Sequence, residues 1–351
     1  MDIREASIDD NDALIELQGK CPVGTTMIVS ILNTPDFFAR AKAYEDYKVY
    51  VICEGKRIIA SGACALRDAV VNGRTEKVGY QFQLFVDPEY RGRRLGGQLH
   101  FVREEYLKKR GAVLSYALII EGNTPSMRHV GRLGVKRQRQ LVMSSISVYK
   151  EMEVAAGGKV RSMLTEDLRG VAALLNEAWQ GYELYEPMTA DAFERLVART
   201  PAYSYDNIFV LEDDGQIVAC LGFWDWSQVM NITVRAITRK MRATGFILDV
   251  LRLFRPLPRG LRPSDTLKQV ALIPIGYKDP EHLAALLRHV NNQAFLRGIE
   301  QIFLICDREH PLLGSLRDFV HIDSTVYLYT KPLQPGVSIA DKLVFISGLD
   351  L

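Results

Sequence analysis

The feature that most constrains the fold of this sequence is an order of strands and helices that occurs twice along the chain. Residues 3–18 are typical of a short strand, an acidic helix cap and an amphipathic helix, and residues 160–179 repeat this order. In each half, two apolar runs joined by a turn follow, at 48–66 and at 207–226. A third strand, a helix and two further strands complete each half.

This repeated order predicts an α+β fold with two tandem domains, each a mostly antiparallel mixed sheet flanked by helices. We expect the first domain at residues 1–150, a linker at 151–158 and the second domain at 159–351. A chain of 351 residues with 48% apolar residues has enough material for two cores.

Composition and short motifs exclude several classes of protein. The formal net charge of +2 argues against a surface that binds polyanions over the whole protein. Five scattered cysteines without a C-x-x-C pair predict reduced thiols, and no metal site is predicted. The N-terminus has no apolar signal region, and no apolar run is long enough for a transmembrane helix, so we expect a cytoplasmic protein.

The most informative segment is an Arg- and Gly-rich loop between a predicted strand at 78–86 and a predicted helix at 96–109. Backbone N–H groups at a helix N-terminus suit a pyrophosphate, and arginines add charge-assisted hydrogen bonds. Glycines let the backbone approach the phosphates closely. The candidate phosphate-binding residues are Arg91, Gly92, Arg93, Arg94, Leu95, Gly96 and Gly97.

This loop resembles the pyrophosphate-binding signature of the GNAT N-acetyltransferase superfamily, (Q/R)-x-x-G-x-(G/A). Arg91 matches its basic residue and Gly96 its last position, whereas Arg94 stands where the family has a glycine. The replacement predicts either weaker CoA binding or a backbone conformation there that any residue can adopt. Asn123 and Ser126, followed by a Leu-Gly pair, resemble a second family pattern, N-x-x-A/S…L-G-F. The resemblance covers residues 1–150.

The resemblance implies that acetyl-CoA donates an acetyl group to a primary amine of a small molecule or a protein, with no metal. Leu84, Phe85 and Val86 match the family strand whose free backbone groups pair with the pantetheine arm, and Asn123 and Ser126 would also contact CoA. The second half lacks the Arg/Gly loop and is expected to be a degenerate GNAT-like domain. A tandem chain can pair its two halves internally, which is compatible with a monomer.

Proton transfer is less clearly encoded. Many GNAT enzymes have a tyrosine seven residues after the asparagine, and this chain has Val130 there. We expect Glu121 to act as a base on the acceptor amine or His129 to handle the proton. Because the tyrosine is missing, the alternative is a CoA-binding sensor or interaction module without catalysis.

An insertion at 231–263 in the second half carries eight basic residues and one acidic residue, Asp249. Its apolar residues near helical spacing predict a basic amphipathic helix; they are Val234, Ile237, Met241, Leu248 and Leu251. Such a helix could cover a sheet face with its basic side in water, recognise an acidic acceptor or partner, or lie on a membrane or a nucleic acid.

Overall fold

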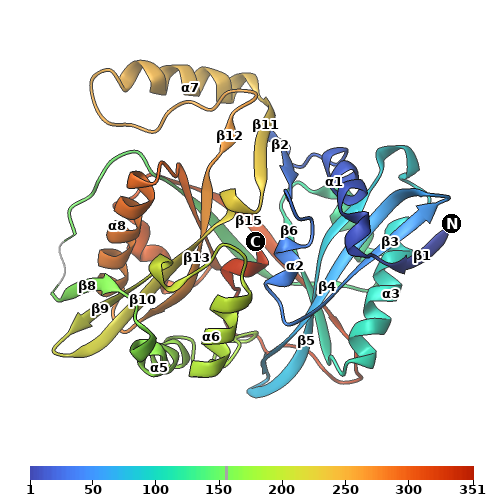
Figure 1. Ribbon diagram of the computed structural model, residues 1–351, viewed down its shortest axis with the longest axis horizontal. Helices are drawn as coiled ribbons and strands as arrows, with labels where there is room; N and C mark the ends of the chain where they lie inside the picture. Colours follow the sequence, from blue (N-terminus) through green and yellow to red (C-terminus); the bar gives the residue numbers. More distant parts are fainter. Residues whose placement is uncertain (155–156) are drawn as a thin grey trace.

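The computed structural model describes residues 1–154 and 157–351, so residues 155–156 of the expected linker lie outside the described residues. Twelve strands form one continuous sheet in the order β1-β3-β4-β5-β6-β15-β7-β14-β13-β10-β9-β8 (Figure 1). Three more strands form a small sheet in the order β12-β11-β2.

The strands of the first half are β1 (Asp2–Glu5), β2 (Met27–Leu32), β3 (Asp46–Glu54), β4 (Arg57–Val71), β5 (Arg74–Val86), β6 (Leu114–Ile120) and β7 (Lys136–Ser147). Those of the second half are β8 (Lys159–Ser162), β9 (Ile208–Asp213), β10 (Gln216–Asp225), β11 (Asn231–Ile237), β12 (Thr266–Leu267), β13 (Gln269–Tyr277), β14 (Gln301–Asp307) and β15 (His321–Pro332). The helices are α1 (Asn11–Gly19), α2 (Ala39–Lys42), α3 (Leu95–Lys109), α4 (Thr124–Gly131), α5 (Leu168–Ala178), α6 (Ala190–Arg199), α7 (Arg239–Leu251) and α8 (Pro280–Leu296).

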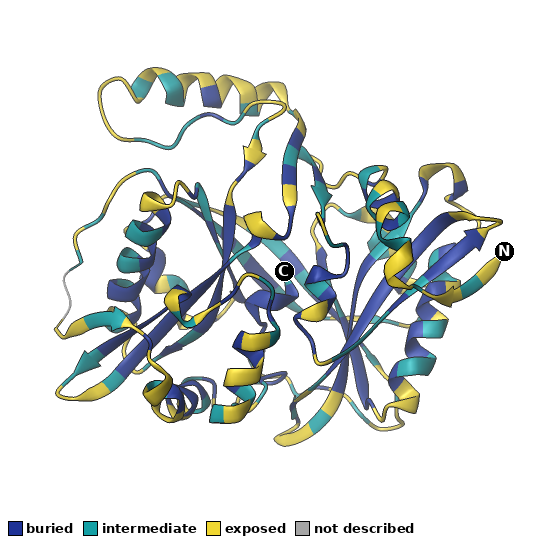
Figure 2. Ribbon diagram, in the orientation of Figure 1, coloured by how far each residue is buried: buried dark blue, intermediate teal, exposed yellow. Residues whose placement is uncertain are grey.

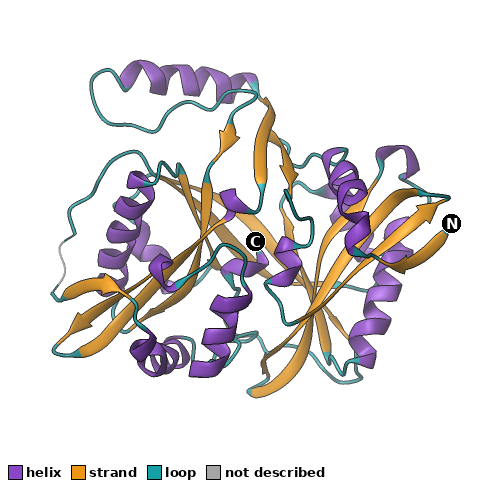
Figure 3. Cartoon of the chain, in the orientation of Figure 1, coloured by secondary structure: helices purple, strands orange, loops and turns teal. Residues whose placement is uncertain are grey.

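The two ends of the large sheet mirror each other, as the repeated sequence pattern predicts. β1-β3-β4-β5-β6 corresponds to β8-β9-β10-β13-β14, and in each set only the last pair is parallel. Helices flank the sheet (Figure 3). Ala65 of β4 shares a core with Leu14 of α1, whereas its neighbours Cys64 and Leu66 pack with Leu107 of α3. Because successive strand residues face opposite sides, α1 and α3 cover opposite faces. The α+β class with a mostly antiparallel sheet is confirmed.

The last strand of each half lies between strands of the other half. β15 inserts between β6 and β7, pairing Val326 with Ile120, and β7 in turn pairs with β14. Neither half therefore completes its sheet without the other. The division at 151–158 stays a prediction, but the strand pairing crosses it.

The insertion differs from the helix expected at 231–263. Its first part is strand β11, which pairs with β2 of the first half, so Val234 and Ile237 lie on a strand and their assignment to the helix was wrong. The burial pattern of β11 alternates at Ile232 and Val234, which is strand periodicity. α7 begins only at Arg239 and stands away from the large sheet (Figures 1 and 2). It therefore does not cover a sheet face.

Two further findings concern the described residues. None of their helices is both long and apolar enough to cross a membrane. All five cysteines are buried as free thiols.

Candidate functional site

The centre of the first half is a cavity between two strands that separate. β5 and β6 pair in parallel only from Val78 to Tyr80, and beyond this point the pairing ends. On its other side, β5 stays paired with β4 through an irregularity where Gln83 has a φ of 48°. A cavity of about 300 Å³ fills the opening. Of the residues predicted from the sequence, it is lined by Leu84, Phe85, Asn123, Ser126 and His129.

A cluster of buried side-chain amides, which the sequence analysis missed, lines this cavity. Gln18 Nε2 donates to Asn33 Oδ1 at 2.7 Å, and Gln83 Nε2 donates to the same oxygen at 3.3 Å. Among the residues that the structure describes, the buried atoms Asn33 Nδ2, Gln81 Oε1 and Gln83 Oε1 have no hydrogen-bond partner. An unsatisfied buried polar atom costs about 1–3 kcal/mol, so these atoms favour a polar ligand in the cavity. No motif marks these glutamines, because their proximity depends on strand pairing.

The Arg/Gly loop lies directly after β5, and neighbouring groups hold its first residues. The carboxylate of Asp87 accepts a hydrogen bond from Glu89 N at 3.1 Å and from Arg57 at 2.8 Å. The loop then presents Arg91, Arg93 and Arg94, all exposed and, within the described part of the chain, without an ion pair. They precede the N-terminus of the 15-residue helix α3. Three free cations beside free helical N–H groups suit a diphosphate.

His129 connects this loop to the cavity. A Cβ atom added to Gly96, in the first turn of α3, would lie 3.0 Å from His129 Cε1. The ring therefore packs on the backbone of α3, and a larger residue at position 96 would displace it by a few tenths of an ångström. Its Nε2 is buried and has no hydrogen-bond partner in the described part of the chain, and burial lowers the pKa of His129 from its usual 6.5. The imidazole is thus neutral at pH 7 and able to accept a proton.

Comparison with known proteins agrees with this geometry. Residues 12–135 match the model of the acetyltransferase (GNAT) family. These residues are a GNAT domain. The match to this family supports acyl transfer as the class of reaction. A search of curated proteins found no match.

Solved structures with the same fold extend over nearly the whole chain. N-myristoyltransferase from Saccharomyces cerevisiae with bound myristoyl-CoA has a TM-score of 0.64 at 13% identity, over 96% of this chain and 82% of that one. A GCN5-related N-acetyltransferase from Sphaerobacter thermophilus has a TM-score of 0.59 at 15% identity, over 96% of this chain and 97% of that one. At these identities the likeness concerns the fold alone.

Glu121, the other predicted catalytic residue of the GNAT domain, lies outside the cavity lining. It is exposed in the turn after β6, and its carboxylate accepts a hydrogen bond from Tyr327 of β15 at 2.7 Å. Val130, at the position of the family tyrosine, is buried in a small apolar cluster. The structure brings His129, but not Glu121, to the opening between β5 and β6.

Arg94 adopts the backbone conformation that the family glycine would favour. Its φ of 61° lies in the left-handed region, so the expectation of a conformation open to any residue was wrong at this position. We expect Arg94→Gly to raise the free energy of unfolding by about 0.5–1 kcal/mol. Glycine relieves the strain of the left-handed backbone, and part of this gain is lost because glycine also makes the unfolded chain more flexible. Thermal or urea unfolding measures this change.

The matched control is Arg93→Gly, which also removes an exposed arginine from the loop but has no left-handed φ to relieve. This variant should be neutral or destabilised. Equal effects of the two variants would show that backbone strain at Arg94 is not the cause.

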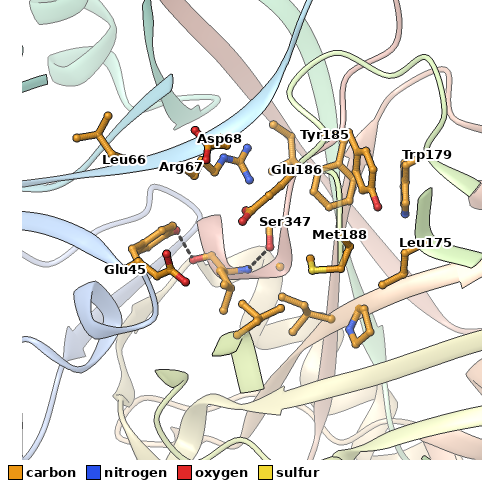
Figure 4. Close-up of a pocket in the computed structure, with 18 of the residues that line it drawn as sticks. Glu45, Leu66, Arg67, Asp68, Leu175, Trp179, Tyr185, Glu186, Met188 and Ser347 are labelled. Carbon is orange, nitrogen blue, oxygen red and sulfur yellow. Dashed lines mark hydrogen bonds between the residues drawn. The ribbon is translucent and has the colours of Figure 1, made fainter. Parts of the chain in front are cut away.

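A second, larger cavity of about 530 Å³ lies between the two halves (Figure 4). Arg67 of β4 and Glu186 of the second half point into it, together with Trp179, Tyr185 and Met188. It is larger than the first cavity but contains neither the Arg/Gly loop nor the separated strands. We therefore assign the chemistry to the smaller cavity.

A buried polar cluster forms the wall between the two cavities. The carboxylate of Asp350 accepts hydrogen bonds from Tyr44 at 2.8 Å and from Tyr116 at 3.0 Å. Arg67 lies 3.5 Å from the same carboxylate. Tyr116 lines the smaller cavity, whereas Tyr44 and Arg67 line the larger one. The Asp350 carboxylate thus contacts residues that line both cavities.

Proposed function

We propose that this protein is an N-acetyltransferase that transfers an acetyl group from acetyl-CoA to a primary amine. One observation carries the proposal: unpaired arginines at the start of α3 stand beside a cavity whose buried amides have free polar atoms. Acetyl-CoA has a diphosphate for the first feature and amide groups in its pantetheine arm for the second. The family match supports acyl transfer, and the acetyl group and the amine are our proposal.

In this proposal each part of the site has a separate role. Arg91, Arg93 and Arg94, with the backbone N–H of Gly96 in the first turn of α3, hold the diphosphate. The backbone groups of Leu84, Phe85 and Val86 on the side of β5 that faces away from β4, with Asn123 and Ser126, orient the pantetheine arm. Of these groups, the Val86 carbonyl also accepts hydrogen bonds from Cys21 Sγ and Arg91 Nε, each at 3.4 Å. The acceptor nitrogen forms a bond to the thioester carbonyl carbon, and the carbon–sulfur bond breaks. Neutral His129 accepts the proton that the amine loses, and CoA leaves as a thiolate that takes up a proton.

A CoA-binding sensor without catalysis is the second candidate, and Val130 in place of the family tyrosine favours it. It requires the same binding loop but no acetylated product. We further propose that the second half is a degenerate GNAT-like domain, supported by its mirrored strand order. A cytoplasmic location and a monomeric state remain predictions from the sequence.

Thermal unfolding with and without acetyl-CoA tests the binding step, which both candidates share. Ligand at 100 times its Kd should stabilise the wild type by about 2.7 kcal/mol. Arg91→Ala combined with Gly96→Asp should abolish this shift, because it removes a cation and adds a carboxylate beside the phosphates. No shift in the wild type at millimolar acetyl-CoA would contradict both candidates.

The second half offers a control with the same two changes of residue type, because Arg169 and Gly170 are an exposed arginine and an exposed glycine in α5, away from the loop. Arg169→Ala combined with Gly170→Asp should keep the full ligand-induced shift. If the shift is present, release of free CoA with a panel of amines separates the two candidates. Turnover supports the enzyme, whereas binding without product supports the sensor.

A further inference from the structure

The segment β11–α7–β12 forms a firmly attached arm that projects from the molecule (Figures 1 and 2). β11 is held by pairing with β2 and β12. The loop between α7 and β12 packs back on α7. There, Asp249 of α7 accepts a hydrogen bond from Gly260 N at 2.9 Å and forms an ion pair with Arg262 at 2.8 Å. Gly245 and Gly260 pack together so closely that a Cβ atom on Gly260 would lie 2.5 Å from the carbonyl oxygen of Gly245. The arm therefore presents one definite face to solvent.

That face is apolar, which is the reverse of the usual arrangement of a surface helix. Large apolar side chains occur at helical spacing along α7 and continue into the turn after it. This outer stripe, with the exposed fraction of each residue, consists of Phe246 (71%), Ile247 (56%), Val250 (42%), Leu253 (80%) and Phe254 (82%). Met241, Leu248 and Leu251 are half-buried, so the inner side of α7 has its own apolar contacts. A contiguous exposed stripe of this kind marks an interaction surface.

The outer stripe is flanked by unpaired positive charge. Five exposed basic residues lie along α7 and the turn after it: Arg239, Lys240, Arg242, Arg252 and Arg255. In the part of the chain that the structure describes, none of the five forms an ion pair. The only carboxylate between residues 239 and 255 is Asp249, which is already bound to Arg262. The partner must therefore be anionic as well as apolar.

We propose that the outer stripe docks on an anionic lipid bilayer, with α7 lying in the headgroup region. A bilayer satisfies both features at once, since the apolar side chains enter the boundary of the acyl chains and the cations meet anionic headgroups. A nucleic acid would satisfy the cations but leave Phe246 and Phe254 in water. A second copy meeting the same face would bring like charges together.

Sedimentation of the full chain with lipid vesicles tests the proposal. Vesicles of phosphatidylcholine with about 30% phosphatidylserine should bind the wild type, and vesicles of phosphatidylcholine alone should bind it much more weakly. Phe246→Ser combined with Phe254→Ser should lower the affinity roughly tenfold or more, because the apolar anchor is lost. Arg239→Gln combined with Arg242→Gln should weaken binding and reduce its dependence on salt.

Phe101 of α3 provides the matched control, because its side chain is 63% exposed on a different face of the chain's surface. Phe101→Ser should bind vesicles like the wild type, and thermal unfolding checks that every variant is folded. The proposal is overturned if the wild type does not bind the anionic vesicles, or if Phe246→Ser/Phe254→Ser binds them as tightly. It is also overturned if light scattering shows that the outer stripe instead drives self-association in lipid-free solution.

Discussion

Replacing Arg67 with methionine should lower the free energy of unfolding by about 3–5 kcal/mol. Arg67 and Asp350 are 3.5 Å apart, and their side chains are 6% and 0% exposed. Removing the guanidinium leaves the Asp350 carboxylate buried with hydrogen bonds from Tyr44 and Tyr116 but without its ion-pair partner. Arg40 donates only to the backbone carbonyl of Asp350, at 2.9 Å. An uncompensated buried charge is among the costliest single changes in a protein. Urea unfolding at pH 7 measures the loss.

Two comparisons isolate the cause of this loss. Arg195→Met removes the same side chain from an exposed pair with Glu45, and it should cost less than about 1 kcal/mol. Asp350→Asn added to Arg67→Met removes the stranded charge and should recover part of the stability. If Arg67→Met costs no more than Arg195→Met, the wall between the cavities does not depend on this ion pair.

Replacing His129 with glutamine should lower kcat by about 10²–10⁴-fold with an acceptor amine that the enzyme uses. Burial lowers the pKa of His129, so the neutral, proton-accepting form persists below the usual pKa of 6.5. In the wild type, the fall in activity that belongs to His129 should therefore lie below pH 6.5. It adds to the rise with pH that deprotonation of the acceptor amine causes. The variant should lose this fall together with the activity. Initial rates across pH measure both effects.

His321→Gln is the matched control, because His321 lies on β15, outside the cavity lining, and this variant should keep the wild-type pH profile. Glu121→Gln tests the other candidate base. If the acidic fall survives in His129→Gln and disappears in Glu121→Gln, the proton acceptor is Glu121. A folded, CoA-binding wild type with no activity on any amine would instead support the sensor.

The local patterns of the sequence predicted where helices and strands occur better than they predicted which strands pair with one another. The helix expected from Gly96 begins at Leu95, one residue earlier. Its start could be predicted because the Arg- and Gly-rich loop ends there and the helical spacing of apolar residues begins. The repeat predicted the mirrored strands, since each strand is marked by its own apolar run and turn. In the insertion, the same spacing of Val234 and Ile237 fitted a helix, and pairing with β2 made this part a strand. Short apolar runs do not distinguish the two by themselves.

The fold class, the loop at the start of α3 and the two candidate proton acceptors could all be predicted from the sequence. These features depend on residues close together in the chain, whose spacing is visible in one dimension. Three other features are visible only in the folded chain. β15 completes the sheet of the first half, Gln81, Gln83 and Asn33 share one cavity, and Asp350 links the two sides of the wall between the cavities. In the folded chain, α7 also turns an apolar stripe to solvent. Each of these depends on segments far apart in sequence, and strand pairing and burial bring them together only in the folded chain.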